Sequence, residues 1–252
     1  MLDCISVENM RLSDQQTIAE LVPGLELMAR AAEGVYRAVN WHGRAAILVG
    51  SGNNGGDGFA LACILRQADI GCAVFTVSQR LSADSEFYAR KAKDAGVPVQ
   101  PFRPGCLEGF DIVVDCLLGT GFQGALRENY RAAIEEINAS GAYVVSVDIN
   151  SGMNGDTGCG DLAVRSDLTV TIGYVKNGLL TENAGRHMKR LVCVDIGIRL
   201  AREENKVCGE EEWLEMPPEQ TRVERNGQVC YRCPEWLDID VIRVDGTDSE
   251  GG

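Results

Sequence analysis

The stretch ILVGSGNNGGDGFALACILR, residues 47–66, ends an apolar run and then places five glycines within nine residues. Gly50, Gly52 and Gly55 fit the pattern GxGxxG, which is typical of a dinucleotide-binding turn between a strand and a helix. Asn53 and Asn54 interrupt this pattern and Asp57 follows it, where a carboxylate would face the pyrophosphate of a cofactor. The stretch therefore predicts a strand–turn–helix unit but leaves its ligand open.

The rest of the chain repeats this alternation of apolar runs and helical patterns. Strands are predicted at 44–50, 72–77, 97–102, 110–119, 142–149, 167–173 and 190–197, and helices at 24–39, 56–68, 82–96 and 126–141. Continuous apolar strands separated by helices are typical of a parallel sheet that is covered on both faces. We expect a Rossmann-like three-layer α/β/α sandwich with a mostly parallel central sheet.

The sequence divides near residue 200. We expect one domain over residues 1–200 and an acidic C-terminal extension of unknown role over residues 201–252, whose last residues are predicted to be disordered. Within the extension, Asn226-Gly227 predicts a hairpin turn. Cys230 and Cys233 form a single CxxC without a second pair, which is weak support for zinc.

Charge and composition exclude several classes of protein. The net charge of −13 argues against binding to nucleic acid, whose phosphates are held by surplus lysine and arginine. No apolar run approaches the roughly 20 residues of a membrane span, and the polar start does not resemble a secretory signal. Several of the ten cysteines lie in apolar runs, as free thiols do. We therefore expect a cytoplasmic protein.

Three glycine-rich loops follow predicted strands, and each carries a carboxylate: Asp57, Asp115 and Asp148. Parallel sheets bind ligands at the carboxyl ends of their strands, so the three loops are expected to converge. The hard oxygen donors on them (Asn53, Asn54, Asp57, Asp115 and Ser151) suit a hard cation, whereas His42 and His187 are poorly placed for zinc. Asp57 is equally well explained as the cap of the following helix, while a site role is favoured for Asp115 and Asp148.

A dehydrogenase is the first alternative. An NAD site needs a carboxylate at the end of the second strand, and residues 75–80 offer none, although Arg80 would suit NADP. Little chain remains for a separate substrate domain. This alternative is therefore weaker than a cation-assisted site.

Four motifs carry a resemblance to a known family. In order and spacing, GSGNNGGDGFALA, VVDCLLGTGFQG, VVSVDINSGMNGDTG and SDLTVTIGYVKNGLLTENAG resemble the YjeF N-terminal domain, the NAD(P)H-hydrate epimerase family, over roughly residues 5 to 200. The chain departs from the family at Asn150 and Asn177, where proline is usual. Neither departure replaces a predicted ligand, so we expect a change in loop stiffness and no loss of activity.

The resemblance implies an often dimeric enzyme that interconverts the R and S epimers of NADHX and NADPHX, the hydrated forms of the reduced cofactors. It implies a homodimer, a potassium ion held by Asn54, Asp115 and Ser151, and a partner dehydratase that accepts only the S epimer. It also implies the residues that bind the substrate: Asn53, Asn54, Gly55, Gly56, Asp57, Gly119, Thr120, Gly121, Phe122, Gln123, Gly124, Ala125 and Asp148. The loop from Gly119 to Ala125 would hold the phosphates through backbone amides.

For the chemistry we expect acid–base catalysis at carbon 6 of the hydrated ring, by loss and return of the hydroxyl or by ring opening. Asp148 is the predicted catalytic residue and Asp57 the second candidate. Lys176 is expected to be a solvated loop lysine, and Arg127 either adds charge at the phosphates or is a solvated helix residue. The alternative function is a non-catalytic binding or dimerisation module of the same family.

Overall fold

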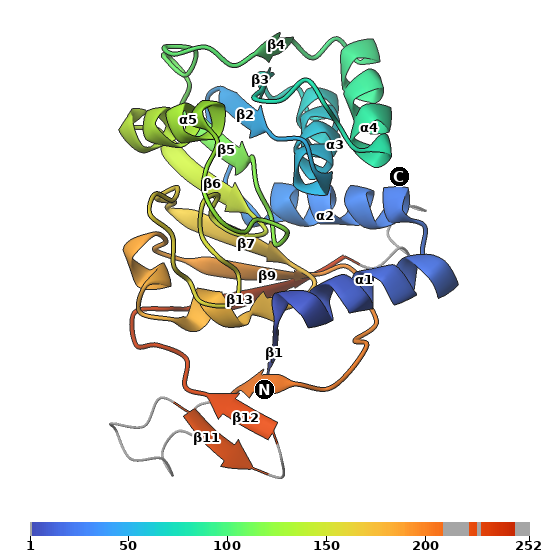
Figure 1. The fold of residues 1–252 in the computed structure, drawn as a ribbon. Helices are drawn as coiled ribbons and strands as arrows, with labels where there is room; N and C mark the ends of the chain where they lie inside the picture. Colours follow the sequence, from blue (N-terminus) through green and yellow to red (C-terminus); the bar gives the residue numbers. More distant parts are fainter. Residues whose placement is uncertain (1, 209–221, 226–227, 245–252) are drawn as a thin grey trace.

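The computed structural model describes residues 2–208, 222–225 and 228–244. Its centre is an eight-stranded sheet in which all neighbouring strands are parallel (Figure 1). In spatial order the strands are β13 (Ile239–Arg243), β9 (Leu191–Asp195), β7 (Leu168–Ile172), β6 (Tyr143–Val147), β5 (Ile112–Cys116), β2 (Ala45–Val49), β3 (Cys72–Thr76) and β4 (Val99–Pro101). The predicted strands are all present, and β13 was not foreseen.

Helices cover both faces of this sheet. The helices α2 (Gly24–Ala38), α3 (Asn53–Gln67) and α4 (Ala83–Asp94) lie on one face, and α5 (Glu128–Ala139) lies on the other (Figure 1). Alternate residues of one strand serve the two faces: Ile47 and Val49 pack under α3, whereas Ala46 and Leu48 pack under α5. This arrangement confirms the three-layer α/β/α sandwich.

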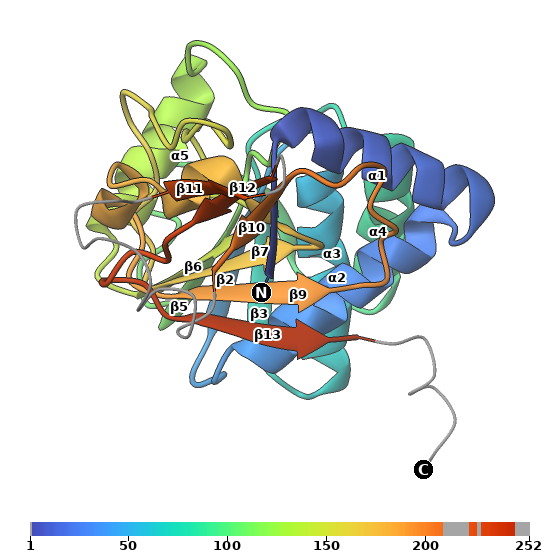
Figure 2. The same ribbon diagram turned by 90° about the horizontal axis from the view of Figure 1, so that it is seen from below.

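A second, mixed sheet packs against the part of the central sheet that α5 leaves uncovered, over β9. Its spatial order is β11 (Arg222–Arg225), β12 (Gln228–Tyr231), β10 (Asn205–Val207), β1 (Leu2–Ile5) and β8 (Val175–Lys176). Figure 2 shows β11, β12 and β10 of this sheet beside one another. Two short 3₁₀ helices, η1 (Asn177–Leu180) and η2 (Ala184–Arg186), follow β8, and α1 (Val7–Glu20) follows β1. Apart from the hairpin turn at Asn226-Gly227, this sheet was not predicted, because its strands are only two to four residues long and β1 pairs with segments near the other end of the chain.

Residues of the C-terminal extension take part in both sheets. β10 pairs with β1, and β13 pairs along its whole length with β9. β11 and β12 are antiparallel with Arg225 opposite Gln228, which is the pairing of a two-residue hairpin. The turn residues 226–227 and the predicted disordered end, residues 245–252, lie outside the described residues.

The glycine-rich stretch after β2 was predicted to be a loop, but most of it belongs to helix α3. Helix α3 begins at Asn53 with Gly52 as its N-cap, so Asp57 lies in the second turn and does not cap the helix. The glycines instead allow close packing: a Cβ on Gly50 would lie 1.8 Å from the Leu117 carbonyl oxygen, and one on Gly56 would lie 2.5 Å from the end of Met28. Within the GxGxxG pattern, close packing accounts for Gly50 and for Gly55, where a Cβ would lie 2.5 Å from the Gly50 carbonyl oxygen, but a Cβ on Gly52 would meet nothing within 4 Å.

The chain order creates a crevice at the carboxyl edge of the sheet. From β2 the chain proceeds outward to β3 and β4, and then returns to β5 on the other side of β2. Ligands bind in open parallel sheets at such a reversal. Within the described residues, no helix has the length and apolarity needed to cross a membrane.

Candidate active site

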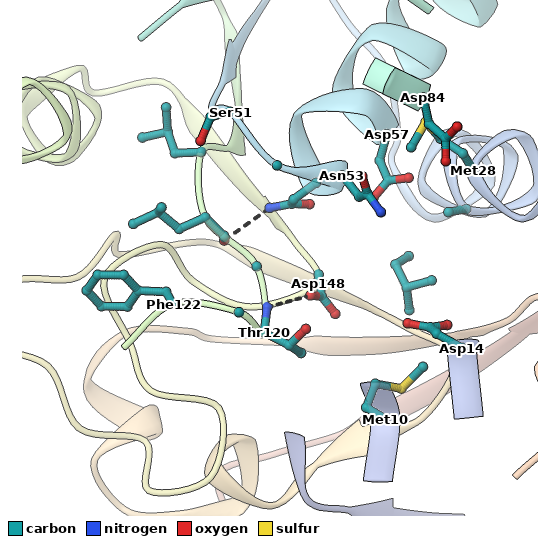
Figure 3. A pocket seen from close by; sticks show the side chains of 18 of the residues that line it. Met10, Asp14, Met28, Ser51, Asn53, Asp57, Asp84, Thr120, Phe122 and Asp148 are labelled. Atoms are coloured by element: carbon teal, nitrogen blue, oxygen red, sulfur yellow. Dashed lines mark hydrogen bonds between the residues drawn. The ribbon is translucent and has the colours of Figure 1, made fainter. Parts of the chain in front are cut away.

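A pocket of about 650 Å³ lies at this edge, beyond the ends of β2, β5 and β6 (Figure 3). One wall is apolar and comes from α1, α2 and the ends of β7 and β9: Met10, Ile18, Leu27, Met28, Ala31, Ile172, Ile196 and Ile198. The opposite wall consists of the start of α3, the segment after β5 and Asp148 at the end of β6. This volume and this mixture of surfaces are those of a site for a small organic ligand.

Most of the predicted substrate-binding residues line this pocket. They are Asn53, Asn54, Asp57, Gly119, Thr120, Gly121, Phe122, Gln123, Ala125 and Asp148. Gly55 and Gly56 are buried within α3, and Gly124 lies in the same loop outside the pocket lining. The sequence prediction thus identified the polar wall and missed the apolar one.

Asp148 is held in an unusual backbone conformation. Its φ is 70°, in the left-handed region that is costly for a residue with a side chain. One carboxylate oxygen accepts a hydrogen bond from the Thr120 amide at 3.0 Å, and the other accepts one from Lys176 Nζ at 2.6 Å. The absence of a side chain at Gly119 permits this, because a Cβ there would lie 2.8 Å from the carboxylate. The surroundings therefore orient Asp148 into the pocket.

The prediction of a solvated Lys176 is wrong. The side chain is fully buried, and its ammonium donates to Asp148, to Thr171 Oγ1 at 2.9 Å and to the Ile172 carbonyl oxygen at 2.7 Å. These three acceptors satisfy all three of its donors. Lys176 belongs to the two-residue strand β8, which pairs with β1 and whose two residues are both buried. It supplies a positive charge beneath Asp148.

Two further carboxyl groups reach the pocket, Asp57 from α3 and Asp14 from α1 (Figure 3). Burial raises the pKa of Asp57 well above its ordinary value, and the nearby carboxylates of Asp148 and Asp14 add to this. Burial also raises the pKa of Asp14 to about 6; the Lys176 charge opposes this rise and that of Asp148 adds to it. The pocket thus combines carboxyl groups that hold their protons with different strength.

Asn54, Asp115 and Ser151, the predicted cation ligands, form one cluster behind the polar wall. Asp115 accepts hydrogen bonds from the Ser151 hydroxyl at 2.5 Å and amide at 2.9 Å. The Ser151 hydroxyl and the Asn54 amide nitrogen both lie within hydrogen-bond distance of the Leu118 carbonyl oxygen. The side-chain oxygen of Asn54 is buried without a partner among the described residues.

The loop after β5 differs in detail from the predicted phosphate cradle. The Thr120 amide is already bonded to Asp148, and the Phe122 amide to the Gly119 carbonyl oxygen. Helix α5 begins at Glu128, and the exposed Arg127 before it lines the pocket. Arg127 therefore lies where it can add positive charge at the rim.

The sequence analysis did not identify Asp14 as a site residue. It lies in α1 between Met10 and Ile18, at a spacing of four residues, and all three line the pocket. A carboxyl group inside an apolar stripe was the available signal. For Lys176, the available signal was its position between the apolar segments that end at Val175 and begin at Leu179.

Comparison with known proteins identifies the family of this chain. The profile of the family described as YjeF-related protein N-terminus matches residues 24–178. An NAD(P)H-hydrate epimerase of Limosilactobacillus fermentum is 37% identical over 199 residues, which are 76% of this chain and 95% of that protein. A bifunctional NAD(P)H-hydrate repair enzyme Nnr of Archaeoglobus fulgidus is 34% identical over 79% of this chain, and the match covers 41% of its own length.

The fold also has a solved counterpart. The crystal structure of the yeast protein ynu0 superposes with a TM-score of 0.64 at 19% identity, over 91% of this chain and all of that one. At this identity the likeness concerns the fold alone. The family match covers the polar wall of the pocket and the part of the apolar wall that comes from α2 and β7, whereas α1 and the end of β9 lie outside the matched residues. The chain therefore belongs to the YjeF-related protein N-terminus family.

Proposed function

We propose that the protein interconverts the R and S epimers of NADHX and NADPHX and so is an NAD(P)H-hydrate epimerase, an isomerase. The observation that carries this is the pocket at the carboxyl edge of the sheet, where Asp148 is paired with Lys176 and faces two further carboxyl groups. Relatives of matching length that bear the name NAD(P)H-hydrate epimerase support the choice of substrate.

The shape and charge of the pocket support a hydrated nicotinamide nucleotide as ligand. The apolar wall offers surface for a ring, and Asp148 and Asp57 offer hydrogen-bonding partners for its hydroxyl and amide groups. At the rim, the positive charge of Arg127 and the glycine-rich loop suit the phosphates. Because the protein has a net charge of −13, the negative phosphates are repelled least where solvent screens them.

The chemistry follows from acid–base catalysis at carbon 6 of the ring. We propose that Asp148 exchanges a proton with the hydroxyl or water at that carbon, while the Lys176 ammonium stabilises the carboxylate form. Loss of the hydroxyl as water and its return on the other face inverts the configuration. Ring opening and closure is the second route. The two routes differ in ¹⁸O-labelled water, because only loss and return of the hydroxyl places one ¹⁸O atom at carbon 6 of every inverted molecule.

A potassium ion is part of the proposal. The buried amide oxygen of Asn54 has no partner among the described residues, and the Asp115 carboxylate and the Ser151 hydroxyl lie in the same cluster. Such neutral and anionic oxygen donors fit a hard cation. When bound there, potassium would neutralise the buried Asp115 and stiffen the loops that carry Asn54 and Ser151.

The remaining expectations are also proposals. We propose that a separate NAD(P)H-hydrate dehydratase consumes the S epimer, as the bifunctional relatives suggest, and that the protein is a homodimer, as the family resemblance implies. A cytoplasmic location is supported by the ten cysteines, all of which are free thiols in the described structure.

A coupled assay tests the proposed function. Purified protein is given the R epimer of NADPHX with excess S-specific dehydratase, in potassium and then in sodium chloride, and the NADPH absorbance is followed. We expect acceleration over the spontaneous rate in potassium and a weaker effect in sodium. No acceleration in either salt, from folded protein, would favour the non-catalytic binding module.

A further inference from the structure

Helix α1 brings one carboxyl group to the apolar wall of the pocket. Met10, Asp14 and Ile18 lie four residues apart on the helix and line the same cavity. Figure 3 shows Asp14 above Met10, facing the space that Asp57 and Asp148 reach from α3 and from the end of β6. Asp14 and Asp148 thus approach this space from different walls.

Nothing in the protein's own packing explains a carboxyl group at this position. Asp14 is the eighth residue of α1, too far from the helix start to act as a cap. Among the described residues it makes neither a hydrogen bond nor an ion pair, in contrast to Asp148. A partly buried carboxyl group without a partner costs folding free energy, which an apolar residue would not. A role toward a ligand accounts for this cost.

The titratable groups that face Asp14 come from four other elements: Asp148 from the end of β6, Asp57 from α3, Asp84 from α4 and Lys176 from β8. Burial and the Asp148 charge raise the pKa of Asp14 to about 6, against the opposing effect of Lys176. A carboxyl group in this range changes its protonation state near neutral pH, as a general acid or base must.

We infer that Asp14 is a second catalytic acid–base group, which serves the face of the hydrated ring opposite to the face that Asp148 serves. This inference rests on the proposed epimerase function. Inversion by loss and return of water needs a proton donor on one face and a proton acceptor on the other. A single carboxyl group on one wall cannot reach both faces of a bound ring.

The step balances with one proton shared between the two carboxyl groups. The protonated group gives its proton to the hydroxyl at carbon 6, the carbon–oxygen bond breaks, water leaves, and the ring nitrogen shares its electron pair with carbon 6 as an iminium. Water then adds to the opposite face and gives a proton to the other carboxylate. The two groups end with their protonation states exchanged, which prepares the enzyme for the reverse direction.

The test compares Asp14→Asn with Asp14→Glu and with the control Glu8→Gln, which removes an exposed carboxylate from the same helix outside the pocket. Initial epimerisation rates of the purified R epimer are measured in potassium buffers from pH 5 to 8.5. We expect Asp14→Asn to lower kcat by at least about 100-fold with little change in KM, and to remove the limb of the pH profile near pH 6. Asp14→Glu should restore part of the rate, and Glu8→Gln should match wild type.

Each other outcome overturns a specific statement. An Asp14→Asn protein with wild-type kcat and pH profile, or with a raised KM alone, would exclude the acid–base role. An Asp14→Asn protein that is less stable than wild type at pH 7.5 would show that Asp14 is structural. An inactive wild-type protein would overturn the proposed function itself, and the wild-type rate separates that failure from the others.

Discussion

At the scale of single residues, the site depends on Asp148 and Lys176. The φ of 70° at Asp148 costs on the order of 1–2 kcal/mol, and the fully buried Lys176 ammonium would be far costlier without its carboxylate partner. The ion pair between the two residues thus offsets both the backbone strain at Asp148 and the burial of the Lys176 ammonium. Such compensated strain is typical of positions that serve a reaction.

This pairing predicts different effects on stability and on turnover. Asp148→Asn should lower kcat by at least about 100-fold and also lower the free energy of unfolding by about 2–4 kcal/mol, because it leaves a buried ammonium uncompensated. The double variant Asp148→Asn/Lys176→Met should regain most of the stability and none of the activity. Urea denaturation and initial rates measure both quantities, and an active double variant would refute the role of the pair.

Asp14 gives a prediction about pH. Its folded pKa of about 6 exceeds the ordinary value of 3.8, so the folded protein holds this proton more tightly than the unfolded chain. The resulting stability is complete below pH 4 and is lost as the pH rises through 6. Asparagine cannot ionise, so Asp14→Asn should gain about 1–3 kcal/mol relative to wild type between pH 4 and pH 7.5. Parallel stability–pH curves for the two proteins would contradict the raised pKa.

At the scale of elements, the turn after β6 is held by a buried asparagine. The Asn150 amide nitrogen donates to the Val164 and His187 carbonyl oxygens and to the Ser166 hydroxyl, at 2.8–3.0 Å. Its oxygen accepts from the Thr169 hydroxyl at 2.7 Å. The family usually has proline here, which restricts φ. In this chain the hydrogen bonds of Asn150 restrict the backbone between Asp148 and Ser151 instead.

Asn150→Ala should therefore destabilise the protein by about 2–3 kcal/mol, since it leaves buried partners unsatisfied. Activity should fall as well, because the turn that orients Asp148 loses its support. The exposed Asn40→Ala is the matched control and should change neither quantity. The comparison uses thermal unfolding and the coupled assay. Unchanged unfolding of Asn150→Ala would mean that the network contributes no net stability.

At the scale of the whole molecule, the sequence was sufficient where periodicity is strong. The strands β2 to β7 and β9, the helices from α2 to α5 and the polar wall of the pocket were all predicted, because buried strands and amphipathic helices have distinct patterns. The polar loops were predicted from glycines and carboxylates at strand ends. The start of α3 was misjudged, because glycines disfavour helices unless close packing requires them.

The features that were missed depend on contacts between distant segments. β1, β8 and β10 are two to four residues long, and β1 pairs with β8 and β10 across about 170 and 200 residues of sequence, so no local pattern marks them. Lys176 lies in one of these strands, and its burial depends on that pairing between distant segments and on its contacts with Asp148 and Thr171. The apolar wall needs α1 to lie over the sheet edge, which only the folded chain shows (Figure 1). Local sequence patterns thus mark the polar wall of the site, whereas the apolar wall forms only through contacts between distant segments.

The central claim is that this pocket inverts one carbon of a hydrated nicotinamide nucleotide. The most direct measurement starts from pure R and from pure S NADHX in separate tubes and follows both by chromatography, in potassium buffer, with catalytic amounts of protein. The account predicts that both tubes reach the same R/S ratio much faster than without protein, and that Asp148→Asn abolishes the acceleration. If folded wild-type protein leaves both epimers to equilibrate at the spontaneous rate, the pocket is not an epimerase site.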